Sequence, residues 1–243
     1  MTYGLISDIH GNLEALDAVL TELSDADGFL CLGDIVGYGA DPGPCLTRVR
    51  ELSNLICVAG NHDLAAVGSY DLGWFNPFAR AAIEWTTAQL TDEHAAYLRS
   101  LPTTAHIDSA LLVHGSLPNE MDYITSAAEA RLCFDAMPGN LAFVGHTHVT
   151  EYYEVRSRSR GPRQISLSSG GEVELRDKGR YIVNPGAIGQ PRDGNPAASF
   201  GEWHVEAGTV TIRRVPYDIE AAQAKMREAR LPEYLLERLS VGR

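Results

Sequence analysis

Five segments of the chain present aspartate, histidine or asparagine directly after a short apolar run. They are Asp8-Ile9-His10, Gly33-Asp34, Gly60-Asn61-His62-Asp63, Val113-His114-Gly115 and Gly145-His146-Thr147-His148. Nearly every one of these polar residues has a glycine beside it, which allows a close approach of the backbone. A lone histidine or aspartate after a strand is most often a cap or turn residue, but five successive occurrences favour one shared site.

Imidazole, carboxylate and carboxamide groups together form a mixed nitrogen and oxygen ligand set. Such a set suits Mn, Fe, Zn, Co or Ni and is poor for a calcium site built from oxygen alone. The candidate ligands outnumber the four of a structural zinc site, which favours two ions that share a carboxylate. Two such ions can clamp phosphoryl oxygens and lower the pKa of a trapped water molecule. Hydrolysis of a phosphoester is therefore the reaction that these residues predict best.

Two of the segments place their polar residues two positions apart, as D-x-H and H-x-H. If the chain stays extended there, both side chains of a pair point to one face, because strands have a period of two. We therefore expect Asp8 with His10, and His146 with His148, to reach the same site.

The elements that must position these residues read as an α/β layout. Apolar runs predict buried parallel strands at Tyr3–Ser7, Phe29–Leu32 and Leu55–Ala59. Apolar periodicity predicts helices over Asn12–Leu23 and Pro44–Leu52. Because open α/β sheets bind ligands at the carboxyl ends of their strands, we expect the motifs to meet at one edge.

The later elements change in character along the chain. The sequence predicts helical stretches from Pro77 to Ser100 and over Ala127–Ala136, and strands at Thr103–Ile107, Ala110–His114 and Leu141–Gly145. After residue 150, short alternating runs between GP, GG and DG turns predict antiparallel strands, and two short helices close the chain. Since no repeat or linker interrupts the pattern, we expect residues 1–243 to form one domain with two packed sheets and helices outside.

The ordered motifs D-I-H-G-N, G-D-I-V-G-Y-G, G-N-H-D, V-H-G and G-H-T-H, with the later N-P-G-A-I-G-Q-P-R, resemble the calcineurin-like metallophosphoesterases, in particular small bacterial and archaeal members. The resemblance implies an α/β fold, a four-layer α/β/β/α sandwich of two mixed β-sheets flanked by helices. It also divides the ligands: Asp8, His10 and His148 bind one metal, Asn61, His114 and His146 bind the other, and Asp34 bridges them. It implies that His62 binds no metal but protonates the leaving oxygen or stabilises the transition state, while a bridging hydroxide attacks phosphorus.

One departure from the family pattern narrows the substrate. Protein phosphatases of this superfamily carry G-D-x-x-D-R, in which the second Asp orients the catalytic histidine and the Arg grips the phosphate. Gly37 and Tyr38 stand at those two places here. We therefore expect the substrates to be phosphodiesters, and secondarily phosphomonoesters, rather than phosphoproteins. The same departure makes diadenosine tetraphosphate a less favoured substrate.

Substrate contacts are expected from Asn12, Tyr38 and Arg192, with a helix cap for Asn12 and a surface ion pair for Arg192 as the alternatives. The loops Ser69–Pro77 and Ser116–Tyr123 are expected to wall the cleft. Three other functions stay open: a protein or nucleotide phosphatase of the same fold, a non-catalytic metal-binding scaffold, and a metal-dependent hydrolase of other esters or amides.

Charge and composition limit the classes of partner that the chain could have. The net charge of the 243 residues is −12, and it is uneven, since residues 1–150 carry −14 and the remainder +2. Such a field disfavours extended nucleic-acid binding and suits the attraction of cations. No apolar run reaches the roughly 18–20 residues of a membrane helix, and four widely spaced cysteines fit a reduced compartment. We expect a cytoplasmic enzyme with a small phosphoester substrate, no membrane partner and two divalent ions, manganese first, and homo-oligomerisation stays open.

Overall fold

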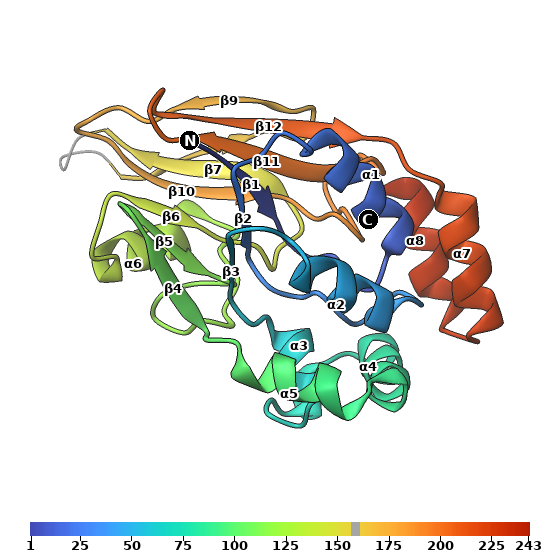
Figure 1. Cartoon of the computed structure of the whole chain (residues 1–243). Helices are drawn as coiled ribbons and strands as arrows, with labels where there is room; N and C mark the ends of the chain where they lie inside the picture. The colour runs from blue at the N-terminus through green and yellow to red at the C-terminus, as the bar shows by residue number, and fades with distance from the viewer. Residues whose placement is uncertain (157–160) are drawn as a thin grey trace.

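The computed structural model describes residues 1–156 and 161–243. Within these residues the strands form two six-stranded sheets (Figure 1). The first sheet has the order β3 (Leu55–Cys57), β2 (Gly28–Cys31), β1 (Thr2–Ile6), β11 (Ala198–His204), β12 (Thr209–Val215) and β9 (Gly171–Glu174). The second has the order β4 (Thr104–Ile107), β5 (Ala110–Val113), β6 (Leu141–Phe143), β10 (Arg180–Pro185), β7 (Thr150–Val155) and β8 (Arg163–Ser166).

The helices are α1 (Leu13–Glu22), α2 (Pro42–Arg50), α3 (Asn61–Ala66), α4 (Pro77–Gln89), α5 (Asp92–Ser100), α6 (Ala127–Ala136), α7 (Ile219–Glu228) and α8 (Glu233–Val241), with one 3-10 turn, η1 (Leu72–Trp74). Among the described residues, no helix combines the length and the apolar character that crossing a membrane requires.

The layers follow from where alternate apolar side chains of each strand point. Leu5 of β1 and Leu112 of β5 belong to one buried cluster between the two sheets. Their neighbours face outward: Ile6 packs in a cluster with residues of α1 and α2, and Leu111 packs with residues of α6. Helices thus cover the outer face of each sheet (Figure 1). The expected α/β/β/α sandwich of two mixed sheets is confirmed.

The strands after residue 150 are divided between the two sheets. β7, β8 and β10 join the second sheet, and β9, β11 and β12 join the first. β11 pairs antiparallel with β1, and β10 pairs parallel with β6, which makes both sheets mixed. Alternation along the sequence predicts local hairpin pairing, but it does not determine which sheet edge a hairpin extends.

The helices differ from the sequence-based expectation in two places. The stretch from Pro77 to Ser100 is two helices, because Thr91 caps α5 by accepting a hydrogen bond from the backbone N–H of His94 at 3.2 Å. The six-residue helix α3 was not predicted, since periodicity needs windows of about 11 residues or more. Asn61 and His62 consequently lie in the first turn of a helix.

Candidate metal centre

The predicted ligands meet at the carboxyl ends of the central strands and at the start of α3. Two groups of donor atoms form there, each with all its atoms within 4.8 Å of one another. The members are Asp8, His10, Asp34 and His148 in one group, and Asp34, His114 and His146 in the other, and all are buried. Asp34 is shared: its Oδ2 lies 3.5 Å from His10 Nε2 and 3.2 Å from His114 Nε2. The two groups contain six of the seven expected ligands, and the seventh, Asn61, stands at the start of α3.

Backbone carbonyls determine which ring nitrogen of three histidines faces the centre. His10 Nδ1 lies 3.0 Å from the carbonyl oxygen of Val36. His114 Nδ1 lies 2.7 Å from that of Leu32, and His148 Nδ1 lies 2.6 Å from that of Gln190. Since a carbonyl only accepts, each Nδ1 carries the proton and donates it, and Nε2 faces the centre. The Nε2 atoms of His10 and His148 lie 3.0 Å apart. Two bare lone pairs at this distance repel each other unless a cation lies between them.

Several buried polar atoms at the centre lack protein partners. Within the described residues, Asp8 Oδ1, Asp34 Oδ2, Asn61 Oδ1 and His114 Nε2 have no hydrogen-bond partner. Asp34 Oδ2 and His114 Nε2 lie 3.2 Å apart and can pair when His114 is protonated, but Asp8 Oδ1 and Asn61 Oδ1 remain, and an unsatisfied buried polar group costs about 1–3 kcal/mol. Divalent transition-metal ions would satisfy all four, because their chemistry suits imidazole nitrogen and carboxylate or amide oxygen. The residues therefore fit a metal centre.

The turns that carry the ligands have unusual backbone conformations. Five ligands adopt positive φ: Asp8 (52°), His10 (49°), Asp34 (55°), His146 (67°) and His148 (59°). A left-handed L-residue is disfavoured by roughly 1–2 kcal/mol. The extended D-x-H and H-x-H segments that we expected are thus turns, and His146 and His148 enter different donor groups. The turns explain how residues two positions apart face two sites.

A later segment holds these turns together. Residues 184–192, the N-P-G-A-I-G-Q-P-R motif, begin in β10 of the second sheet and lead toward β11 of the first. Asn184 Nδ2 donates to the carbonyl of Gly145 at 2.8 Å, and the N–H of Gly189 donates to the carbonyl of Asp8 at 2.9 Å. The motif thereby ties the H-x-H turn to the end of β1, a role that the sequence did not reveal.

Asp63 organises the centre without being one of the predicted site residues. Its carboxylate accepts four backbone hydrogen bonds, from Asp34 (2.7 Å), Ile35 (2.9 Å), Val36 (3.1 Å) and Gly60 (3.0 Å). Burial, together with the charge of Asp34, raises the pKa of Asp63 to about 7. The signal was present in the sequence, since an acidic residue in the first turn of a helix commonly bonds back to the capping residue.

The histidines of the centre differ in protonation. Burial lowers the pKa of His62 to about 4 and that of His146 to about 3, so both rings are neutral at pH 7. Burial lowers the pKa of His114 as well, but the carboxylates of Asp34 and Asp8 and the hydrogen bond to the Leu32 carbonyl together outweigh it and raise that pKa to about 10. Burial alone would raise the pKa of Asp34, and His114 nevertheless holds it well below its usual range. Without a cation, the His114 proton therefore neutralises the shared carboxylate.

Packing orients His62. Its ring centroid lies 4.4 Å from that of Tyr38 and 5.0 Å from that of Phe75. Its Nδ1 is buried and has no hydrogen-bond partner among the residues that the structure describes. A Cβ on Gly37 would lie 2.4 Å from this Nδ1, so no aspartate fits at the place of the second Asp of G-D-x-x-D-R. Aromatic contacts replace that carboxylate.

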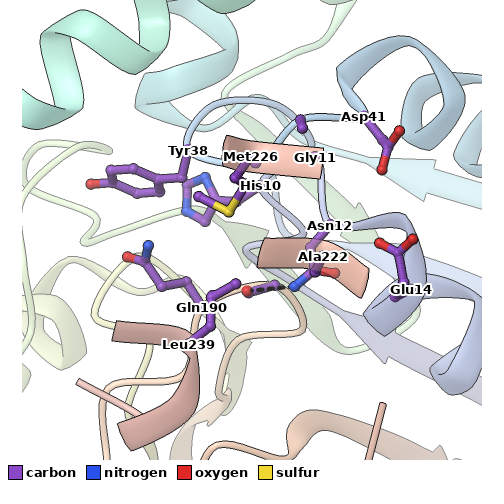
Figure 2. A pocket seen from close by; sticks show the side chains of 13 residues that line it. His10, Gly11, Asn12, Glu14, Tyr38, Asp41, Gln190, Ala222, Met226 and Leu239 are labelled. Carbon is purple, nitrogen blue, oxygen red and sulfur yellow. Dashed lines mark hydrogen bonds between the residues drawn. The ribbon is translucent and has the colours of Figure 1, made fainter. Parts of the chain in front are cut away.

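Asn12, one of the expected substrate contacts, is engaged within the protein. Its side chain accepts from the N–H of Ala15 at 3.1 Å. It also donates to the carbonyl of Gly189 at 2.9 Å (Figure 2). It lines a cavity of about 10 Å³ that Met226 of α7 and Leu239 of α8 help to close. The helix-cap alternative describes the observed position of Asn12.

Tyr38 and Arg192 lie together at the edge of the centre. Arg192 Nη2 donates to Tyr38 Oη at 3.2 Å and to Gln190 Oε1 at 3.1 Å, and the guanidinium lies 5.6 Å from the Tyr38 ring centroid. These contacts are to a phenol and an amide rather than to a carboxylate. The positive charge of Arg192 is therefore available to an anion.

A cleft of about 460 Å³ opens beside the donor groups. Asn61, His62 and His146 line it together with Tyr38. The two predicted loops wall it: one contributes Tyr70, Trp74, Phe75 and Asn76, and the other contributes Met121, Asp122 and Tyr123. The cleft gives a ligand access to donor residues of the centre and to His62.

A sandwich whose strand ends gather aspartate and histidine around a shared carboxylate defines a metallophosphoesterase. Residues 1–208 match the model of the calcineurin-like phosphoesterase superfamily domain, and the chain belongs to this family. It is accordingly a phosphoester hydrolase, as the sequence predicted.

Relatives and solved structures agree with this placement. A metallophosphoesterase from Sphaerobacter thermophilus is 46% identical, with a TM-score of 0.89 over 100% of this chain and 99% of that chain. An uncharacterized protein of Methanocaldococcus jannaschii is 36% identical over 98% of this chain and 97% of its own length. A symmetrical bis(5'-nucleosyl)-tetraphosphatase of Pectobacterium carotovorum is 28% identical over 84% of this chain and 81% of its own length.

The substitution Gly145→Ala should weaken cation binding. A Cβ there would lie 2.1 Å from Ser7 Oγ and 2.7 Å from Asp8 Oδ2, so the Asp8 carboxylate must move. We expect a loss of about 10–100-fold in manganese affinity by titration calorimetry, as for other residues that orient metal ligands. Gly161→Ala is the control, since its Cβ would meet no described atom within 4 Å. Equal affinities for the two variants would contradict the placement of Asp8.

Cation uptake should release about one proton per chain near pH 7.5. In the metal-free protein His114 is protonated, because its pKa is raised to about 10, and a ligand nitrogen must lose its proton. Apparent affinity should therefore rise with pH between 7 and 9. Titration calorimetry in buffers of different protonation enthalpy measures the number of protons, and a value near zero would refute the His114–Asp34 pairing.

Proposed function

We propose that this protein is a dinuclear metal-dependent phosphodiesterase that also accepts phosphomonoesters. The observation that carries the proposal is the position of Asp34, whose Oδ2 lies within 3.5 Å of histidine Nε2 atoms from both donor groups. A carboxylate shared in this way supports two ions rather than one. Manganese is our first choice for a nitrogen and oxygen donor set, with Fe, Zn, Ni or Co as the alternatives.

Each ion would be held by residues from several strand ends. Asp8, His10 and His148 would hold one, Asn61, His114 and His146 the other, and Asp34 would bridge them. When bound, the two ions would neutralise charge on the phosphoryl oxygens and lower the pKa of water, which provides hydroxide for in-line attack on phosphorus near pH 7.

His62 would act on the leaving oxygen. Its Nδ1 is buried against Gly37, so its other ring nitrogen is the one available to a substrate in the cleft. With a pKa of about 4 the ring is neutral at pH 7. It would therefore donate a hydrogen bond to the developing negative charge, and it would transfer a proton only when the substrate anion raises its pKa.

Arg192 would contact a phosphoryl oxygen. Its charge contributes to lowering the pKa of both His62 and His148, which indicates a guanidinium near the centre. The Tyr38 hydroxyl holds this guanidinium at 3.2 Å. Tyr38 and Arg192 would thus supply the phosphate contact that the Arg of G-D-x-x-D-R supplies in protein phosphatases.

Charge in the cleft favours a diester over a polyphosphate. Asp122 and Glu129 line the cleft, and Arg192 lies at its edge. A diester brings one negative charge, whereas a nucleotide polyphosphate brings several that these carboxylates would repel. The likeness to a bis(5'-nucleosyl)-tetraphosphatase makes polyphosphate hydrolysis the second candidate. Parallel assays on diadenosine tetraphosphate and a diester separate the two.

A cytoplasmic location stays our prediction. All four cysteines lie in the described part of the chain as buried free thiols, which fits a reducing compartment. Whether the chain forms a homo-oligomer also stays a prediction.

The variants His62→Ala and His146→Ala should separate catalysis from metal binding. His62→Ala should retain manganese but lose about 10²–10⁴-fold in kcat on bis-p-nitrophenyl phosphate, since it removes the group that stabilises the leaving oxygen. His146→Ala should lose manganese as well as activity, because it removes a ligand of one donor group. Metal content by plasma emission spectrometry and initial rates measure both effects. A scaffold without catalysis predicts no manganese-dependent rate in the parent protein, and full activity in His62→Ala would refute the role of His62.

A further inference from the structure

Trp74 is the most exposed large apolar side chain of the described residues, at 79% of its surface. It stands on η1 and lines the cleft beside the metal centre. Its neighbours Leu72 and Phe75 pack against buried clusters, whereas Trp74 belongs to none of the clusters formed by the described residues. An exposed indole contributes little to folding, and exposed aromatic surface commonly marks a ligand site.

The backbone that carries Trp74 is fixed. Asp71 accepts from the N–H of Gly73 through Oδ1 at 2.8 Å, and its carbonyl accepts from the N–H of Trp74 at 3.3 Å. The next residue, Phe75, packs edge-on against Tyr70 at 5.9 Å and against His62 at 5.0 Å between ring centroids. The indole therefore lines the cleft from a backbone segment whose next residue, Phe75, packs against His62.

A second aromatic surface comes from the other loop. The ring of Tyr123 stacks on the ring of His146 at 3.9 Å and 10°, and about half of Tyr123 is exposed. Tyr123 lines the same cleft as Trp74. A ligand in the cleft thus meets aromatic surface from both loops and donor residues of the metal centre.

We propose that Trp74 is the stacking platform for the base of a nucleoside phosphodiester, a specificity that rests on the proposed phosphodiesterase activity. Stacking on an aromatic side chain serves any base, because every base has a π-face. Trp74 directly precedes Phe75, the residue that touches His62, and all three line the same cleft. A base on Trp74 would therefore occupy the cleft that also contains His62.

Size and charge support a nucleoside rather than a further phosphate. The cleft volume of about 460 Å³ lies in the range of roughly 300–1,000 Å³ that small-molecule sites occupy. Asp122 and Glu129 line it, and they suit an uncharged base and sugar with hydrogen-bonding groups better than a second anion.

Two substrates with the same leaving group test the proposal. Thymidine 5'-(p-nitrophenyl phosphate) and methyl p-nitrophenyl phosphate both release p-nitrophenolate, but only the first carries a base. With the manganese-loaded full chain, Trp74→Ala should lower kcat/KM for the thymidine substrate about 5–150-fold more than for the methyl substrate. Trp74→Phe, which keeps a ring, should restore most of the difference.

Phe78→Ala is the matched control. Phe78 is also an exposed aromatic residue, but it packs against Tyr234 with ring centroids 5.0 Å apart and is not one of the residues that line the cleft. This variant should leave the ratio of the two kcat/KM values unchanged. An equal loss for both substrates in Trp74→Ala, or the same ratio change in Phe78→Ala, would overturn the proposal.

Two further outcomes separate this proposal from neighbouring ones. If bis-p-nitrophenyl phosphate depends on Trp74 as strongly as the thymidine substrate, the site accepts any aryl group and the nucleoside assignment fails. If the parent protein hydrolyses neither substrate, the proposed function fails, and binding still tests the platform. Thymidine 5'-monophosphate should then quench tryptophan fluorescence of the parent but not that of Trp74→Phe, and equal quenching would contradict the platform.

Discussion

The structure depends on holding two buried carboxylates and several imidazole nitrogens closer together than they would stay on their own. Burial of an unpaired carboxylate costs several kcal/mol, and facing lone pairs add repulsion. In each of the two carboxylates, one oxygen is hydrogen-bonded within the protein and the other faces the centre. Asp8 Oδ2 accepts from the hydroxyl of Ser7 and the N–H of His146, and Asp34 Oδ1 accepts from the N–H of His62. The other oxygen of each is left to the centre. Asp8 Oδ1 lies 3.2 Å from His148 Nε2 and Asp34 Oδ2 lies 3.2 Å from His114 Nε2, so positive charge at the centre, from a protonated His114 or from a cation, stabilises the carboxylates.

The sandwich provides this arrangement because both sheets contribute strand ends to one place. The turns after β1 and β2 bring Asp8 and Asp34, and the turns after β5 and β6 bring His114 and His146. Asp63 accepts from three backbone N–H groups of the second turn and from that of Gly60, and residues 184–192 connect the first turn to the last. Disfavoured left-handed conformations at the ligands persist since these bonds hold them on several sides. The backbone thus fixes the positions of the expected ligands, and the two loops wall the cleft beside them.

The sequence revealed the donor residues because parallel strands end on one side of a sheet, so Asp8, Asp34 and His114 could be grouped without a structure. The period-two pattern did not separate His146 from His148, a division that only the family resemblance implied, because it depends on left-handed conformations at both residues that such a pattern cannot express. Asp63 was missed for a related reason: three of its four backbone partners are N–H groups 27 to 29 residues away, and only Gly60 is close in sequence. The sheet membership of β9 and β10 was equally hidden, since alternation reports pairing within a hairpin and not the edge that the hairpin extends.

The most direct test of this account is anomalous diffraction from crystals grown with manganese, recorded on both sides of the manganese absorption edge. The account predicts two anomalous peaks per chain, one among Asp8, His10 and His148 and the other between His114 and His146, with Asp34 in contact with both. A single peak, or two peaks that Asp34 does not join, would contradict a centre organised around a shared carboxylate.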